Sequence, residues 1–184
     1  MKTPVSRLHA MLFLLMCSVT SLASAQDYIV EVVLFTQPSS RIVAGPAPEL
    51  DWKADAAELD STTRSNVRPI DDSRHRLANE ARKLSAQGSR ILFHQAWTQP
   101  AGTPVAVTKG EDLTGFDLYP VQGVVSLSRD NTLEANVAFW VNHEAASMDS
   151  EPVSERLKQS RRLRPDEVHY LDHQSLGMLI IVSR

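Results

Sequence analysis

The stretch that decides the fold reads TLEANVAFWVN and spans residues 132–142. Every second side chain in it is apolar, namely Leu133, Ala135, Val137, Phe139 and Val141. This alternation predicts a strand with one face in a hydrophobic core, because successive side chains of a strand point to opposite faces. Turn-forming residues RDN precede it at 129–131, and residues 118–128 supply a second arm. The sequence therefore predicts an antiparallel hairpin here.

Further strands are expected on the N-terminal side of this hairpin. Residues 28–35 read YIVEVVLF and are apolar except for Glu31, which predicts a buried strand in the centre of a sheet. Residues 90–99 and 105–108 predict two more strands, separated by prolines and a glycine.

The C-terminal part offers two alternatives for residues 155–164, since local propensity allows helix or strand there. A Pro165-Asp166 turn separates this segment from a final apolar run at residues 176–182. We favour a pair of strands formed by these two segments.

One main helix is expected over residues 73–87. Side-chain oxygens of the Asp71-Asp72-Ser73 cluster can accept the free amides of a first turn, and Gly88 is typical of the position past a helix end. The apolar positions form one narrow stripe, Leu77, Ala81 and Leu84. Such a helix packs on a sheet with its polar side in water.

The remaining connection, residues 36–70, contains five of the chain's prolines and glycines and predicts an irregular path with a short helical turn at residues 54–59. Trp52 is expected to pin this connection to the body. Together the elements predict a single α+β domain, in which a mainly antiparallel sheet of about six to eight strands carries the helix on one face.

Residues 1–25 have the pattern of a cleaved secretory signal peptide, with Lys2 and Arg7 before an apolar core and Ala23-Ser24-Ala25 at the cleavage site. Cleavage leaves a single domain over residues 26–184 and removes Cys17, the only cysteine. We therefore expect an exported protein without disulfides. No second apolar stretch approaches the roughly 20 residues that a membrane-spanning helix needs, so no membrane insertion is expected after cleavage.

Charge argues against a general nucleic-acid binder. Without Lys2 and Arg7 the chain keeps 17 of its 19 basic residues against 22 acidic ones, a net charge of −5 with neutral histidines. Nucleic-acid binding relies on an excess of lysine and arginine near the phosphates. An anionic ligand would have to meet a local basic patch.

A metal-dependent hydrolase is one alternative function. His94, His169, Asp172 and His173 are the residue types that zinc prefers. The alternative interpretation is that these side chains hydrogen-bond one another and the backbone, as most buried polar groups do. No HExxH motif, serine-hydrolase elbow or glycine-rich phosphate loop occurs in the sequence, so we expect neither a metal nor another cofactor.

Arg161, Arg162 and Arg164 form a basic cluster near the C-terminus. Arginines bind carboxylates and phosphates in bidentate geometry, so this cluster is one candidate for ligand recognition. Its structural alternative is a charged sheet edge, or ion pairs with Glu155, Asp166 and Glu167.

Three segments of the chain resemble the CsiV family of periplasmic peptidoglycan-binding proteins. They are the YIVEVVLF strand at residues 28–35, HQAWTQP at residues 94–100, and the block that runs from QSRRLR at 159–164 through HYLDH at 169–173 to LGML at 176–179. The resemblance covers nearly the whole chain after residue 25, and the final block is its most specific part.

The resemblance implies a non-catalytic protein that binds peptidoglycan, supports cell-wall synthesis and cell shape, and assists an outer-membrane lipoprotein activator of a bifunctional penicillin-binding protein. It does not fix the residues that touch the glycan. On chemical grounds, sugar rings and peptide carboxylates call for aromatic, polar and arginine side chains, which predicts a site made of Trp97, Arg161, Arg162, His169, Tyr170 and Asp172. An envelope protein that binds polypeptide through an open sheet edge is the remaining alternative.

Overall fold

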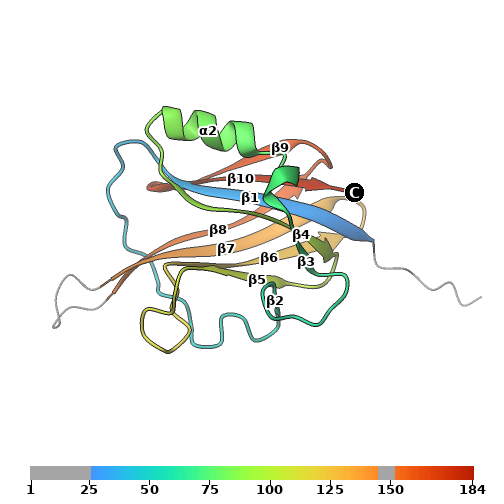
Figure 1. The fold of residues 1–184 in the computed structure, drawn as a ribbon, viewed down its shortest axis with the longest axis horizontal. Helices are drawn as coiled ribbons and strands as arrows, with labels where there is room; N and C mark the ends of the chain where they lie inside the picture. Colours follow the sequence, from blue (N-terminus) through green and yellow to red (C-terminus); the bar gives the residue numbers. More distant parts are fainter. Residues whose placement is uncertain (1–25, 145–151) are drawn as a thin grey trace, which may run out of the picture.

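The protein is built from two five-stranded sheets in a computed structural model that describes residues 26–144 and 152–184 (Figure 1). Sheet A has the order β3 (Arg68–Ile70), β4 (Ile91–Pro100), β1 (Asp27–Thr36), β10 (Leu176–Ser183) and β9 (Val168–Asp172). Sheet B has the order β2 (Ala57–Glu58), β5 (Val105–Lys109), β6 (Val121–Arg129), β7 (Leu133–His143) and β8 (Val153–Leu163). All strand pairs are antiparallel except β2 and β5.

The main hydrophobic core lies between the two sheets. It contains the apolar row of β7 predicted from the alternation, and alternate residues of β1 such as Val30 and Val32. Phe93 of sheet A and Phe139 of sheet B meet edge to face, with ring centroids 5.6 Å apart. The predicted hairpin is confirmed as β6 and β7, and the predicted central position of residues 28–35 is confirmed as β1.

The helix is shorter than the sequence predicts. Residues 73–87 form a 3₁₀ turn, η1 (Asp72–Arg74), and then α2 (Ala78–Ala86). Asp71 accepts the Ser73 amide and so caps the 3₁₀ turn instead of the α-helix. The start of α2 is held by Glu31 of β1, which accepts hydrogen bonds from the backbone amides of Arg76 and Leu77. A cap from a distant strand leaves no local sequence signal.

α2 packs on the face of sheet A that points away from sheet B. Leu77 and Ala81 form a small second core with Val33, Phe35 and Ile181. Figure 1 shows α2 above sheet A and sheet B below it. The expected single sheet with a helix is therefore replaced by a mainly β structure in which the inner face of sheet A is covered by a second sheet.

Two further expectations about strands were wrong. Residues 26–144 and 152–184 form ten strands instead of six to eight, because β2 and β3, two and three residues long, are too short to show a period-two pattern. Residues 155–163 lie in a strand, as favoured, but this strand, β8, pairs with β7, whereas the final run pairs with β1 and β9. The turn at Pro165-Asp166 thus carries the chain from sheet B to sheet A.

The long connection after β1 contains the two short strands instead of the helical turn expected at residues 54–59. Trp52 packs edge to face on Trp140 of β7, with centroids 6.2 Å apart, which confirms that Trp52 pins the connection. Within the described ranges no helix is long and apolar enough to cross a membrane. The predicted signal peptide, residues 1–25, lies outside the described residues.

Candidate functional site

The loop that follows β1, residues 37–42, runs from sheet A to sheet B. At its start the Gln37 amide donates to the carbonyl of Ser175, 2.8 Å away, just before β10. Beyond its end the Val43 amide donates to Oε2 of Glu155 on β8, at 3.2 Å. The loop is therefore fastened to both sheets.

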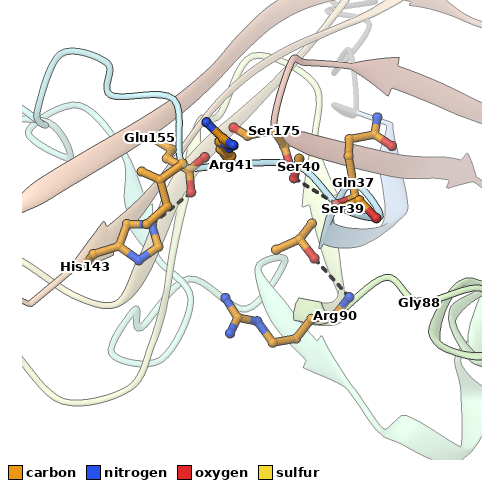
Figure 2. A pocket seen from close by; sticks show the side chains of 11 residues that line it. Gln37, Ser39, Ser40, Arg41, Gly88, Arg90, His143, Glu155 and Ser175 are labelled. Atoms are coloured by element: carbon orange, nitrogen blue, oxygen red, sulfur yellow. Dashed lines mark hydrogen bonds and ion pairs between the residues drawn. The ribbon is translucent and has the colours of Figure 1, made fainter.

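A cavity of 430 Å³, here called the loop groove, lies beside this loop (Figure 2). Its walls come from β1, the turn after α2, the ends of β7 and β8, and the turn before β10. The lining residues are Thr36, Gln37, Ser39, Ser40, Arg41, Ile42, Gly88, Arg90, His143, Glu155 and Ser175. Most of these side chains are polar or charged, so the groove suits a polar ligand.

Two exposed guanidinium groups, those of Arg41 and Arg90, line the groove. Neither forms an ion pair with another residue of the described ranges. The acidic group of the groove, Glu155, is only 3% exposed and accepts hydrogen bonds from His143 Nε2 at 2.9 Å and from the Val43 amide. Because Glu155 is already bound, the two arginines remain available for a carboxylate or another anion.

A second hollow of 690 Å³ shares Gln37, Ser39 and Ser40 with the loop groove. Asp172 lines this hollow. Tyr170 lies beside it: its hydroxyl donates to Asp172 Oδ1 at 2.7 Å, and the Gln37 side-chain amide donates to both residues. Burial, and then the hydrogen bond to the Asp172 carboxylate, raise the pKa of Tyr170 above its usual value. Its ring stacks on Phe35, with an interplanar angle of 22°, and is 45% exposed.

Comparison of the sequence with models of known protein families gives a match that covers nearly the whole chain. The family model described as "Peptidoglycan-binding protein, CsiV" matches residues 8–184, which is nearly the entire chain. The chain belongs to the CsiV family. Comparisons with curated proteins and with solved structures gave no match.

Of the six site residues predicted from sequence, the structure brings two together in this CsiV-family protein. Tyr170 and Asp172 lie on the same face of β9 and are hydrogen-bonded to one another. Trp97 is 0% exposed in the core between the sheets, and its indole N–H donates to Gln99, so it offers no face to a ligand and is removed from the site.

The other three predicted residues lie apart from this pair. His169 is next to Tyr170 and therefore on the opposite face of β9, where its Nε2 accepts the Arg164 amide at 3.0 Å. Arg161 and Arg162 are exposed near the end of β8 and point to opposite faces of sheet B, because they are consecutive strand residues. The structure does not gather these arginines around one ligand.

The four residues considered as metal ligands do not converge either. His173 contacts Ser175 at the turn before β10, and His169 contacts Arg164. His94 lies under the start of α2, where it contacts Glu31 and packs against His75. The hydrolase built on His94, His169, Asp172 and His173 therefore has no common centre in this CsiV-family protein.

Sequence reasoning missed the residues that line the loop groove, above all Arg41, Arg90, His143 and Glu155. Arg41 lies in a proline-rich connection and Arg90 follows a helix end, where single arginines are common surface residues. Of the ion pairs considered as the structural alternative for the arginine cluster, the one between Arg164 and Glu167 is present at 3.7 Å. Glu155 pairs with His143 instead of an arginine of the cluster. Only Ser39-Ser40 after a strand gave a weak signal of a polar loop.

Proposed function

We propose that this protein binds peptidoglycan in the periplasm through the loop groove and the adjoining Tyr170 and Asp172, without catalysing a reaction. The observation that carries the proposal is membership, over nearly the full chain, of a family described as peptidoglycan-binding. The groove contributes the chemistry that such binding needs.

Peptidoglycan presents acetylated sugars joined to short peptides that end in carboxylates. The guanidinium groups of Arg41 and Arg90 suit the carboxylates, because charge-assisted bidentate hydrogen bonds are the strongest that a side chain offers. Gln37 and the serine hydroxyls beside it suit the amide groups. The exposed Tyr170 ring suits the apolar face of a sugar.

A binding role in place of an enzymatic one is supported by the family description and by the separation of the predicted metal ligands. We further propose that the bound protein supports cell-wall synthesis and cell shape by assisting an outer-membrane lipoprotein that activates a penicillin-binding protein. Export to the periplasm has a direct test, because cleavage after residue 25 makes Gln26 the first residue of the mature protein.

Pelleting with purified sacculi tests the site. The double variant Arg41→Ala/Arg90→Ala should bind at least about 10-fold more weakly, because each charge-assisted hydrogen bond contributes about 1.5–3 kcal/mol. Its free energy of unfolding should stay within about 0.5 kcal/mol of wild type, since both side chains are exposed.

The matched comparison is Arg161→Ala/Arg162→Ala, which removes the same charge from β8. Loss of pelleting in this variant alone would move the site to β8 and leave the function standing. Failure of the wild-type protein to pellet with sacculi would refute peptidoglycan binding itself.

A further inference from the structure

Three potential metal ligands converge beneath the start of α2. Glu31 comes from β1, His94 from β4, and His75 from the segment between η1 and α2. One donor atom of each lies within 4.8 Å of the donor atoms of the other two. Glu31 Oε1 and His94 Nε2 are 2.8 Å apart, and the ring centroids of His75 and His94 are 4.6 Å apart.

Among the three residues of this cluster, His75 has a ring nitrogen without a hydrogen-bond partner in the described part of the chain. Its side chain is 4% exposed, and its Nε2 forms no hydrogen bond within the described ranges. Within the described ranges the nearest carboxylate oxygen is Asp72 Oδ1, which is 3.5 Å from His75 Nε2 and is not hydrogen-bonded to it. A buried nitrogen without a partner is unfavourable by about 1–3 kcal/mol, so a bond from His75 Nε2 to an ion would be favourable.

The donors fit a transition metal better than an alkaline-earth ion. Two imidazoles and a carboxylate are typical zinc ligands, whereas calcium and magnesium prefer oxygen alone. Donors of a tetrahedral zinc site lie about 3.3 Å apart, as bond lengths of about 2.0–2.1 Å require. The cluster needs only small side-chain shifts to reach that geometry. Asp72, whose side chain is 96% exposed, is free to swing in as a fourth ligand.

Glu31 has room for an ion. A carboxylate offers about four lone-pair positions. Oε1 accepts the Leu77 amide and His94, and Oε2 accepts the Arg76 amide, so one position on Oε2 is unused. An ion can also take the place of the proton between Glu31 and His94. If His94 is neutral, this proton moves to Nδ1; if both ring nitrogens carry a proton, the one on Nε2 leaves to solvent. In either case Nε2 has a lone pair for the ion.

We propose that Glu31, His75 and His94 bind a divalent transition-metal ion of the Zn²⁺ type, with Asp72 or water as the fourth ligand. The ion joins two strands of sheet A to the segment that leads into α2. It therefore locks the helix onto the sheet and acts as a structural site. This site is independent of the loop groove and of the proposed function.

Calorimetric titration of the EDTA-stripped full chain with zinc chloride tests the site. Wild type should bind one equivalent. His75→Ala should bind more than about 100-fold more weakly, because even loss of an outer-shell partner weakens metal binding about 10- to 100-fold. His75→Ala should remain folded, since His75 Nε2 has no hydrogen bond to lose and the change removes only the packing of this ring against His94. Zinc should raise the melting temperature of wild type and leave that of His75→Ala unchanged.

His143→Ala is the matched control, because it breaks the other buried imidazole–carboxylate pair. This variant should bind zinc as wild type does. The site would be overturned by wild type that binds no stoichiometric zinc, or by equal zinc affinity in His75→Ala and wild type.

Discussion

Glu31 and Glu155 are two buried carboxylates with the same local design and different surroundings. Each pairs with an imidazole on the neighbouring antiparallel strand, at 2.8 Å for His94 and 2.9 Å for His143. In both cases the histidine lies two residues from the position directly opposite the glutamate. Diagonal pairs of this kind are within reach of long side chains. Each glutamate also accepts a hydrogen bond from the backbone of an irregular segment, from Arg76 and Leu77 to Glu31 and from Val43 to Glu155.

The surroundings of the two pairs decide what each can do. Burial raises the pKa of Glu31, but hydrogen bonds from His94 and from the amides of Leu77 and Arg76 outweigh burial and lower the pKa below its usual value. Glu31 thus holds α2 from below. Glu155 lines an open groove and holds the loop that carries Arg41. The same pair therefore builds the fold in one place and shapes a recognition surface in the other.

The largest effect is expected from Glu31→Ala. The change leaves two buried amides and an imidazole without their acceptor, and breaking such a buried pair is destabilising by about 3–5 kcal/mol. Urea denaturation in the presence of EDTA measures this without a contribution from metal. A loss below about 1 kcal/mol would show that Glu31 does not anchor the helix.

A smaller loss of stability, about 1–3 kcal/mol, is expected for Glu155→Ala, which removes the acceptor of one amide and one imidazole. The sacculus assay separates the two glutamates further. Without Glu155 the Val43 amide loses its acceptor, so the loop is released from β8 and Arg41 is displaced with it. Glu155→Ala should weaken pelleting, whereas Glu31→Ala, at temperatures where it remains folded, should not. Equal binding by both variants would contradict the division of roles.

The smallest effect on stability is expected from a change at Asp112. This carboxylate accepts hydrogen bonds from backbone amides and, unlike Glu31 and Glu155, has no histidine partner in the described residues. Its oxygens accept the amides of Thr114, Gly115, Asp117 and Leu118. Among the causes of its shift the Thr114 amide is the largest, and the amides together lower the pKa of Asp112 below its usual value.

A lowered pKa means that the ionised group stabilises the fold above the unfolded pKa, near 4, and that this contribution disappears as pH falls through the folded value. The difference in urea midpoint between wild type and Asp112→Asn should therefore be visible at pH 6 and shrink toward pH 3. A difference that does not change with pH would refute the role of the charge.

The pattern of apolar residues predicted the long strands, because the positions of the apolar residues along a strand reflect which of its faces is buried. The alternation in β7 and the apolar run of β1 specify their buried faces, and the structure confirms both. Pairing between distant segments leaves no such record. Nothing within residues 155–164 distinguishes β7 from β10 as a partner, since strands in either sheet need the same inward row of apolar side chains.

The site was less predictable than the fold. Tyr170 and Asp172 are two residues apart on one strand, so their meeting follows from local geometry. Arg41 and Arg90 belong to segments that meet only because Thr36 and Arg90 bind one another at the end of sheet A. Trp97 was wrongly assigned to the site, because the sequence pattern of a strand is the same whether its aromatic residue packs in the core or contacts a ligand.

The place of β1 beside β10 has a consequence for how the chain reaches its native state. The first strand of the described chain lies between β4 and the last strand, whereas β5 to β8 follow one another as neighbours in sheet B. Sheet B can form by successive local hairpins, but sheet A remains incomplete until residues 176–183 have been synthesised. Contacts between such distant segments form slowly. A protein truncated before β10 would thus retain a folded meander beside an unfinished, exposed apolar sheet, which is a substrate for proteases.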